Sequence, residues 1–230
     1  MSRRPEASLL PDYFEAIYAC DSDPWRFASS GYERAKYDAT LAALARPRYG
    51  RALEVGCSIG VLTRDLAPRC DALLALDAAE APLAAARARC AGLPGVEFRQ
   101  MRVPQDWPEA AAAFDLILLS EVVYYLDAAD VVRLARRVGG TLAPGGEVLL
   151  VHWTGETDYP LTGDEAAERL IAAAAGFAAV VRQDRATRSA SPWRSACAPR
   201  RSWPSPACRA SGGPGMPSRR RPGRCAATGW

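Results

Sequence analysis

Residues 51–66, RALEVGCSIGVLTRDL, decide the predicted fold of this chain. A short apolar run ends at an acidic residue, two glycines follow at positions 56 and 60, and a helical pattern then begins. Three interpretations are open for such a loop: a cradle for a nucleotide, a dinucleotide site that has lost part of its motif, and a tight turn without a ligand. The pattern around the loop favours the first.

Strands and helices alternate after this loop. We expect strands at residues 51–55, 71–77, 96–102, 114–120, 147–153 and 177–183, and helices at 60–69, 79–92, 128–142 and 163–175. The strand at 114–120 is continuously apolar, as in a parallel strand that is buried on both faces. Two more helices are expected before residue 48, where Tyr37, Leu41 and Leu44 recur at helical spacing. The order predicts an α/β fold with a doubly wound, mostly parallel sheet.

The loop does not match either common phosphate-binding motif. Ser58 stands where a dinucleotide fingerprint has its second glycine, and no Gly-Lys-Ser/Thr follows as in a P-loop. Asp77, however, ends the next strand 21 residues after Gly56, where a carboxylate suits the two hydroxyls of a ribose. Together with Glu54 and Gly60, this predicts a cofactor site at the carboxyl ends of the strands that need not hold a pyrophosphate.

The composition is that of a soluble globular protein. Of 230 residues 49% are hydrophobic and 24% charged, and no run approaches the ~20 apolar residues of a membrane span. The first residues lack the apolar core of a secretory signal, so a cytoplasmic protein is expected. With no C-x-x-C pair and a single histidine, we expect neither a metal site nor a structural disulfide. Small apolar roles are expected for Cys20, Cys57, Cys70 and Cys90.

Residues 185–230 differ in composition from the rest. They hold ten arginines, no Asp or Glu, and no Ile, Leu, Val, Phe or Tyr. Such a segment buries too little apolar surface to offset its chain entropy, so disorder is expected. One interpretation is an Arg-rich arm for nucleic acid or acidic surfaces. We favour the other, an unselected extension such as GC-rich coding DNA gives in a shifted frame, and expect no specific nucleic-acid partner.

Four motifs resemble those of class I S-adenosylmethionine-dependent methyltransferases. They are LEVGCSIG (53–60), LLALDAA (73–79), FDLILLSEVVYYL (114–126) and LAPGGEVLLVHW (142–153). More narrowly, DPWRFASSGYERAKYDATLAAL (23–44) and VHWTGETDYPLTGDE (151–165) are similar to the nodulation protein S family. Members of that family N-methylate the amino sugar at the non-reducing end of chitooligosaccharide nodulation factors. The resemblance covers roughly residues 12–184.

The resemblance implies an organisation in three parts. Residues 1–48 would form a helical cap that contributes to the site, residues 49–184 the cofactor-binding methyltransferase domain, and residues 185–230 the disordered tail. The family's fold normally ends with an antiparallel strand, and nothing after residue 184 can form one. We therefore expect a sheet without its final antiparallel strand, with an unpaired edge and a tendency to aggregate.

The resemblance also implies S-adenosyl-L-methionine as the cofactor and assigns its contacts. The cofactor loop would comprise Glu54, Gly56, Cys57, Ser58 and Gly60. Asp77 would hold the ribose, and Ala78, Val103 and Pro104 would border the adenine. Arg102 stands where relatives usually carry an acidic residue, so backbone contacts would replace side-chain recognition there. Ser120, Glu121 and Tyr125 would lie at the sulfonium end, while Trp25 and Arg26 would close over the methionine end, with Arg26 pairing its carboxylate.

Candidate acceptor and catalytic residues follow strands four and five. Methyl transfer to an amine needs an unprotonated nucleophile, so His152 and Glu121 are candidate proton acceptors, although a lone histidine at a strand end is often structural. Tyr124 and Tyr125 are candidate walls of the methyl channel or core residues. Tyr32 and Trp153 offer flat faces to a sugar ring or pack in an ordinary way. Asp158, Thr162 and Asp164 are candidates for hydroxyl or ammonium recognition, with helix capping as the alternative for the last two.

The predicted function is N-methylation of an amino sugar, as in chitooligosaccharide nodulation factors, or of a related small amine. A first alternative is an O- or N-methyltransferase of other small metabolites. A second is a protein that binds the cofactor without catalysis or acts through its Arg-rich tail. The expected partner is therefore a small-molecule or oligosaccharide amine acceptor, and the sequence predicts no oligomeric state.

Overall fold

The computed structural model describes residues 4–108 and 113–184. The chain divides into two units, Met1–Val180 and Val181–Trp230, of which the first holds the helices and strands that follow. The predictions for residues 185–230, disorder and the absence of a final antiparallel strand after residue 184, lie outside the described residues. In the described ranges, no helix has the length and apolar character that crossing a bilayer requires.

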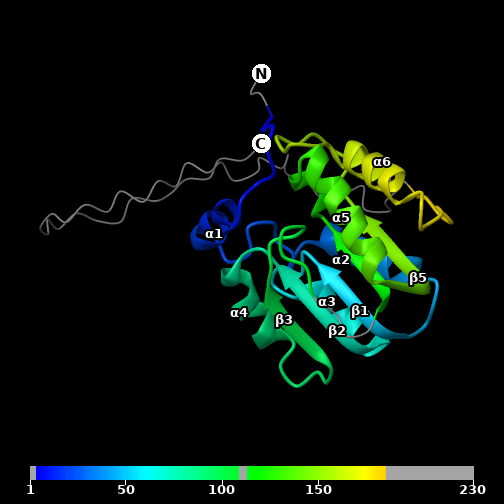
Figure 1. The fold of residues 1–230 in the computed structure, drawn as a ribbon. Helices are drawn as coiled ribbons and strands as arrows, with labels where there is room; N and C mark the ends of the chain where they lie inside the picture. Colours follow the sequence, from blue (N-terminus) through cyan, green and yellow to red (C-terminus); the bar gives the residue numbers. More distant parts are fainter. Residues whose placement is uncertain (1–3, 109–112, 185–230) are drawn as a thin grey trace, which may run out of the picture. The chain divides into compact units, whose positions relative to one another are not determined.

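The core of the first unit is a five-stranded sheet in the order β3-β2-β1-β4-β5, with every neighbouring pair parallel (Figure 1). The strands are β1 (Tyr49–Val55), β2 (Cys70–Asp77), β3 (Val96–Gln100), β4 (Phe114–Ser120) and β5 (Leu142–Val151). From β1 the chain adds β2 and β3 on one side and then β4 and β5 on the other, so the carboxyl ends of β1 and β4 form the topological switch point where such folds bind ligands. The α/β prediction is confirmed.

Helices fill the connections between strands. They are α1 (Pro11–Cys20), α2 (Gly31–Ala43), α3 (Val61–Leu66), α4 (Glu80–Arg89), α5 (Ala128–Thr141) and α6 (Gly163–Ala174), with short 3-10 turns η1 (Ala67–Arg69) and η2 (Val123–Tyr125). The predicted elements agree with these bounds to within a few residues, except in two places. The fifth strand begins at Leu142 rather than residue 147 and ends before His152. The sixth predicted strand is absent.

The predicted strand at 177–183 is wrong. The amides of Phe177 and Ala178 both donate to the carbonyl of Ala174, which extends the turn that ends α6. Val180 follows with 55% of its surface exposed, and residues 178–184 carry no regular structure. The apolar residues in this stretch predict a strand, but a strand also needs a neighbouring strand with which its backbone forms hydrogen bonds.

The core lies around β1 and β4. Ala52, Leu53, Leu116 and Leu118 are almost completely buried, as a central parallel sheet requires. Helix α2 closes one side: Tyr37 and Leu44 are buried in the same cluster and Leu41 packs against it, so the predicted apolar face is confirmed. Among the cysteines, Cys57, Cys70 and Cys90 are buried as expected, whereas Cys20 is exposed, because it lies at the end of α1.

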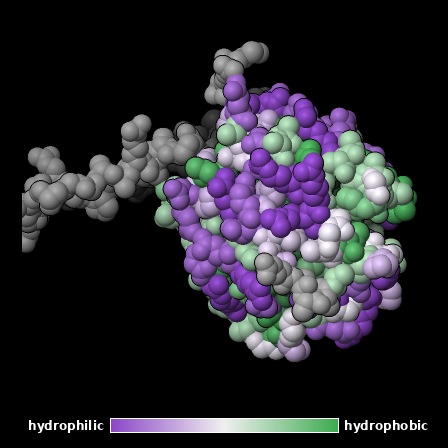
Figure 2. Space-filling model, in the orientation of Figure 1, coloured by the Kyte–Doolittle hydropathy of each residue, from purple (hydrophilic) through white to green (hydrophobic). Residues whose placement is uncertain are grey.

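Strand β5 is the outermost strand on its side of the sheet within the described residues. All of its residues are partly or fully exposed, in contrast to β4 beside it. Hydrophobic colour also gathers in Figure 2 over the region where α6 ends in Figure 1, and Phe177 is 40% exposed there. An unpaired apolar edge of this kind favours association between chains. The tendency to aggregate remains a prediction.

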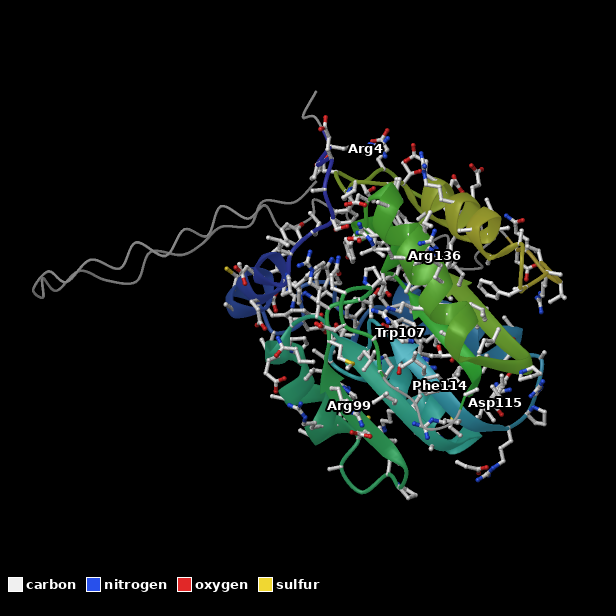
Figure 3. The ribbon with its side chains drawn as sticks, viewed as in Figure 1. Arg4, Arg99, Trp107, Phe114, Asp115 and Arg136 are labelled. Carbon is white, nitrogen blue, oxygen red and sulfur yellow. The ribbon has the colours of Figure 1, made fainter. Side chains whose placement is uncertain are left out.

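The N-terminal segment runs to the carboxyl edge of the sheet. Ser8 donates from its hydroxyl to Asp130 at 2.5 Å and accepts from the amide of Asp127 at 2.9 Å, while the amide of Leu9 donates to the carbonyl of Tyr125. Helix α1 therefore lies beside the strand ends to which the arrowheads of β1 and β2 point in Figure 1. Figure 3 labels Asp115 at the other edge, where its carboxylate accepts the amides of Gly50 and Arg51.

Thr162 begins α6, and the capping interpretation of this residue is confirmed. Its hydroxyl accepts from the amide of Glu165, and the Glu165 carboxylate accepts from the amide of Thr162, which is a capping box. We expect Thr162→Ala to destabilise the protein by about 1 kcal/mol, because an amide of the first turn loses its partner. Urea unfolding of both proteins measures this. Equal midpoints would show that the cap contributes nothing.

Candidate functional site

The loop between β1 and α3 uses most of its backbone donors within the protein. The amides of Gly56 and Cys57 both donate to the carbonyl of Leu76 at the end of β2, at 2.8 and 2.9 Å. The amide of Ser58 donates to the carboxylate of Asp77 at 2.8 Å. These bonds fix the loop against β2, so it presents a rigid rim rather than a set of free amides that a phosphate would need.

The two glycines are required by packing. Gly56 has φ +85°, and an added Cβ would lie 2.6 Å from the carbonyl oxygen of Ser120 and 2.3 Å from the side chain of Val122. Gly60 has φ +74°, and its Cβ would lie 2.9 Å from Ala86 in α4. At both glycines, the position that a Cβ would take is already occupied by atoms of the protein. The glycine at 56 therefore brings the loop close to the end of β4, and the glycine at 60 brings it close to α4.

Two carboxyl groups lie on either side of this loop, of which Glu54 is buried and Asp77 is half-buried. Burial raises the pKa of Glu54 to about 7, although the neighbouring hydroxyl of Thr63 acts in the opposite direction. One of its carboxyl oxygens, Oε2, is buried without a well-formed hydrogen bond among the described residues. Burial also raises the pKa of Asp77 to about 6, against the hydrogen bonds from the amides of Ala79 and Ser58. A carboxylate accepts about four hydrogen bonds, so Asp77 retains capacity for hydroxyl donors. The pair suits a ligand that carries a cation and hydroxyl groups.

Helix α1 supplies a contact to the loop that the sequence did not predict. The hydroxyl of Tyr18 lies 2.5 Å from the hydroxyl of Ser58, and its ring packs edge-on against Trp25 at 5.4 Å. Glu15 accepts the amide of Glu80 at 2.6 Å, which ties α1 to the first turn of α4. Tyr18 is 40 residues from Ser58 in the sequence, so no local pattern predicts the contact.

Among the residues predicted for the methionine and adenine ends, Trp25 and Val103 are buried and Arg26 is not. Arg26 is 63% exposed and forms an ion pair with Asp21 at 2.9 Å, so its pairing with a cofactor carboxylate stays a prediction. The carbonyl of Ala78 accepts from Gln100, and Pro104 is buried beside Val103. The amide of Arg102 donates to Asp106, four residues along the chain.

Glu121 follows β4 with φ +57° and is the centre of a polar cluster. One carboxylate oxygen accepts from Lys36 at 2.6 Å; the other accepts from the hydroxyl of Tyr124 at 2.6 Å and the amide of Trp153 at 3.0 Å. Burial alone would raise the pKa of Glu121, but the charge of Lys36 and these three donors lower it below its ordinary value. Such a carboxylate anchors a cation better than it accepts a proton. Ser120 is buried directly before it.

An aromatic cluster covers the end of β4. Tyr124 stacks on Tyr159 at 5.2 Å between ring centroids, and Tyr125 meets both rings edge-on at 4.6 Å. Tyr125 also contacts Phe14 of α1 at 4.8 Å. Tyr124 is buried, so it packs in the core while its hydroxyl reaches Glu121. Tyr159, which the sequence did not single out, is the buried centre of this cluster.

His152 lies beside the same cluster, with its ring 5.2 Å from that of Tyr124. Its Nε2 is buried and has no hydrogen-bond partner within the part of the chain that the structure describes. Burial lowers the pKa of His152 to about 4, so the imidazole is neutral at pH 7. A buried neutral ring with an open nitrogen is available for a hydrogen bond from a ligand, although it is a weak base.

The remaining predicted acceptor residues are only partly brought together. Tyr32 and Trp153 meet edge-on at 5.7 Å, so two side chains 121 positions apart share one wall next to Glu121. Asp158 is exposed. Lys36, like Tyr18 and Tyr159, was not predicted from the sequence. Its signal was available, because it is the single lysine of the chain.

The family model described as "Nodulation protein S (NodS)" matches residues 15–150, more than half of the chain. This chain belongs to the nodulation protein S family. The matched range contains the loop at Gly56, the carboxylate of Asp77, and Glu121 with its partners Lys36 and Tyr124. The family prediction made from the motifs is confirmed.

Curated members of the family align over part of their length. Nodulation protein S of Rhizobium tropici is 34% identical over 131 residues, which are 55% of this chain and 53% of that protein. The protein of the same name from Sinorhizobium fredii is 32% identical over 129 residues, covering 55% of this chain and 59% of the relative. This chain thus spans between half and three fifths of the length of these relatives.

Two solved structures share the fold with appreciable identity. A candidate methyltransferase from Pseudomonas syringae is 42% identical with a TM-score of 0.54, covering 61% of this chain and 85% of that one. The N-methyltransferase NodS of Bradyrhizobium japonicum WM9, solved in complex with S-adenosyl-L-homocysteine, is 27% identical with a TM-score of 0.54, covering 59% and 72%. These neighbours confirm the Rossmann-like class of methyltransferase folds.

Proposed function

We propose that this chain is an S-adenosylmethionine-dependent N-methyltransferase whose acceptor is the amine of an amino sugar, as in a chitooligosaccharide, or a related small amine. The observation that carries the proposal is the pair of carboxyl groups, buried Glu54 and half-buried Asp77, on either side of a rigid glycine loop at the switch point of the sheet. Family membership and the NodS neighbour solved with S-adenosylhomocysteine support it. A cytoplasmic location belongs to the same proposal.

The residues present fit this cofactor. The buried, unpartnered oxygen of Glu54 suits the ammonium of its methionine part, and Asp77 suits the ribose hydroxyls. When bound, S-adenosylmethionine would supply a methyl group on a sulfonium. Transfer of that group to an amine is an in-line displacement, so the protein contributes mainly by positioning the two partners.

The residues after β4 and β5 suit the acceptor. The ionised Glu121 would attract the cationic form of an amine and hold it at the carboxyl edge of the sheet. Once the amine has lost its proton to solvent, the neutral His152 would accept a hydrogen bond from it. Tyr32 and Trp153 would present ring faces to a sugar, and Tyr124 with Tyr125 would exclude water from the methyl path.

The test is binding followed by turnover. We expect the chain to bind S-adenosylhomocysteine in calorimetry and to methylate a chitooligosaccharide with a free amine at its non-reducing end. The fully N-acetylated oligosaccharide is the matched control and should not react. Failure to bind S-adenosylhomocysteine would refute the enzyme proposals, and binding without turnover of any amine or hydroxyl acceptor would favour a non-catalytic cofactor-binding protein.

One comparison favours O-methylation as a second candidate. The ubiquinone biosynthesis O-methyltransferase of Pseudomonas paraeruginosa is 35% identical over 101 residues, 43% of this chain and 42% of that protein. Its alignment is shorter than those of the nodulation proteins. If the protein methylates a phenol and gives no product with the amino sugar, the O-methyltransferase alternative is correct.

Affinity for S-adenosylhomocysteine should increase with pH. The pKa values of Glu54 and Asp77 are raised, to about 7 and about 6. Without ligand, ionisation of these two groups therefore lowers folding stability as the pH rises from the ordinary carboxyl pKa to these values. An ammonium and hydroxyl donors favour the ionised forms, so binding releases protons. We expect tighter binding at pH 8 than at pH 5.5.

Calorimetry in buffers with different ionisation enthalpies measures this proton release. Glu54→Gln removes the group with the higher pKa, so most of the change in affinity between pH 6.5 and 8 should disappear in this variant. A variant that keeps the full pH dependence would show that Glu54 does not face the ligand.

A further inference from the structure

The chain contains 28 arginines and one lysine, and the lysine is buried in the candidate site. Lys36 lies on α2 with only 13% of its side chain exposed. Most arginine ion pairs in the described residues lie on the surface, as for Arg34, which is 47% exposed on the same helix and pairs with Asp38 and Asp65. The ion-paired arginines are thus exposed, whereas the largely buried position 36 has a lysine.

The ammonium of Lys36 joins two acidic side chains from different segments. Its Nζ lies 2.7 Å from Oε2 of Glu33, which is completely buried, and 2.6 Å from Oε1 of Glu121. The other oxygen of Glu121 accepts the hydroxyl of Tyr124 and the amide of Trp153. Three segments that are distant in the sequence thus fix one carboxylate: α2, the turn η2 and the residue pair after β5.

The space around Nζ suits a compact cation. The rings of Tyr32 and Tyr37 both lie with their centroids 5.9 Å from Nζ, so the ammonium is enclosed by two carboxylates and two aromatic rings. A guanidinium is planar and larger than an ammonium, and the two carboxylates and two rings already enclose Nζ closely. Replacement by arginine would therefore push Glu121 out of place.

We propose that Lys36 is a positioning residue of the methyl-acceptor site, which holds the Glu121 carboxylate ionised and in one orientation toward the acceptor amine. The proposal rests on the proposed function, because it takes the edge beside Glu121 to be the acceptor site. Lys36 does not itself touch the reacting atoms. It acts through Glu121, and through the same contact it joins α2 to the carboxyl edge of the sheet.

The electrostatic consequence is a change in the ionisation of Glu121. The titratable and charged groups that face this contact are Glu33, Glu121, Tyr32, Tyr37, Tyr124 and His152. Lys36 is the only cation among them. Without it, Glu121 loses the charge that lowers its pKa and faces the Glu33 carboxylate with no cation between them, so the pKa of Glu121 rises.

The experiment compares Lys36→Met, Lys36→Arg and the double variant Glu33→Gln/Lys36→Met with the wild-type protein. For Lys36→Met we expect kcat at pH 7 to fall ~100-fold and to recover partly above pH 8, where Glu121 ionises again. The affinity for S-adenosylhomocysteine should stay within about threefold, because most of its predicted contacts are on other segments and the substitution leaves the Glu121 side chain in place. Lys36→Arg should not restore kcat.

Arg34→Met is the matched control, since it removes an exposed cation from the same helix and should leave kcat and its pH profile unchanged. If Lys36→Met does not fold, the double variant takes its place, because it removes one buried carboxylate with the cation. An alkaline shift in the same direction is expected, but a smaller one, because Glu33 no longer repels Glu121. A wild-type pH profile in the folded variant, or full activity of Lys36→Arg, would overturn the proposal. Loss of S-adenosylhomocysteine binding in parallel with kcat would also overturn it.

The two proposals fail in different ways. A wild-type protein that binds no S-adenosylhomocysteine and methylates no amine refutes the proposed function. An active wild-type protein whose Lys36→Met variant keeps the same kcat and pH profile refutes only the role of Lys36.

Discussion

Gly56→Ala should destabilise the protein by about 3 kcal/mol or more, the largest effect that we expect from removing or adding a single methyl group here. The reason is twofold. Gly56 has φ +85°, which costs an L-residue about 1–2 kcal/mol. The added Cβ would also lie 2.6 Å from the carbonyl oxygen of Ser120, and the backbone of β4 cannot move away without breaking its bonds to β1. Chemical unfolding measures the loss.

Gly92→Ala separates the two causes. Gly92 has nearly the same backbone conformation, φ +82°, but nothing lies within 4 Å of its added Cβ. This control should therefore lose only the conformational part, about 1–2 kcal/mol. If both variants lose the same amount, the close approach of the loop to β4 contributes nothing, and the loop would be a turn that tolerates side chains.

Asp77→Asn should weaken the binding of S-adenosylhomocysteine ~100-fold, or about 2.7 kcal/mol. The carboxylate accepts the amides of Ser58 and Ala79, and the ribose hydroxyls are proposed to bind its remaining lone pairs. In asparagine one oxygen becomes an NH₂ donor that faces a backbone N–H, so the loop shifts and an acceptor for the ribose disappears. Calorimetry at pH 7.5 gives the two dissociation constants.

Asp71→Asn is the matched control for this measurement. Asp71 lies on the same strand at its other end, is 59% exposed and pairs with Arg48 on the surface. Its substitution should change the affinity by less than about twofold, because exposed ion pairs contribute little. Equal affinities of the Asp77→Asn and wild-type proteins would mean that the ribose is held elsewhere.

The elements of the fold follow from local patterns in this chain. The continuous apolar run at β4 and the alternation with amphipathic helices predict a parallel sheet, because strands buried on both faces cannot carry polar side chains. The same logic failed at residues 177–183. The apolar residues there do not form a strand, since the amides of Phe177 and Ala178 donate hydrogen bonds to the carbonyl of Ala174 at the end of α6.

The candidate cofactor residues were also predictable, because the two glycines and Asp77 are tied to strand ends by their spacing. Their physical roles were not. The sequence marks Gly56 and Gly60 as sites where a ligand comes close, whereas the tertiary structure shows that protein atoms of β4 and α4 fill that space. Which atoms approach a glycine depends on elements that are distant in the sequence.

The sequence by itself determined the parallel α/β order, the family and the position of the loop and carboxylates at one edge of the sheet. Only the tertiary structure decided the surroundings of Glu121. Lys36, Tyr124 and Trp153 come from three separate segments and meet at one carboxylate through packing of α2, η2 and the residues after β5. Local periodicity specifies which face of each element is buried, but contacts between elements depend on how those faces pack together.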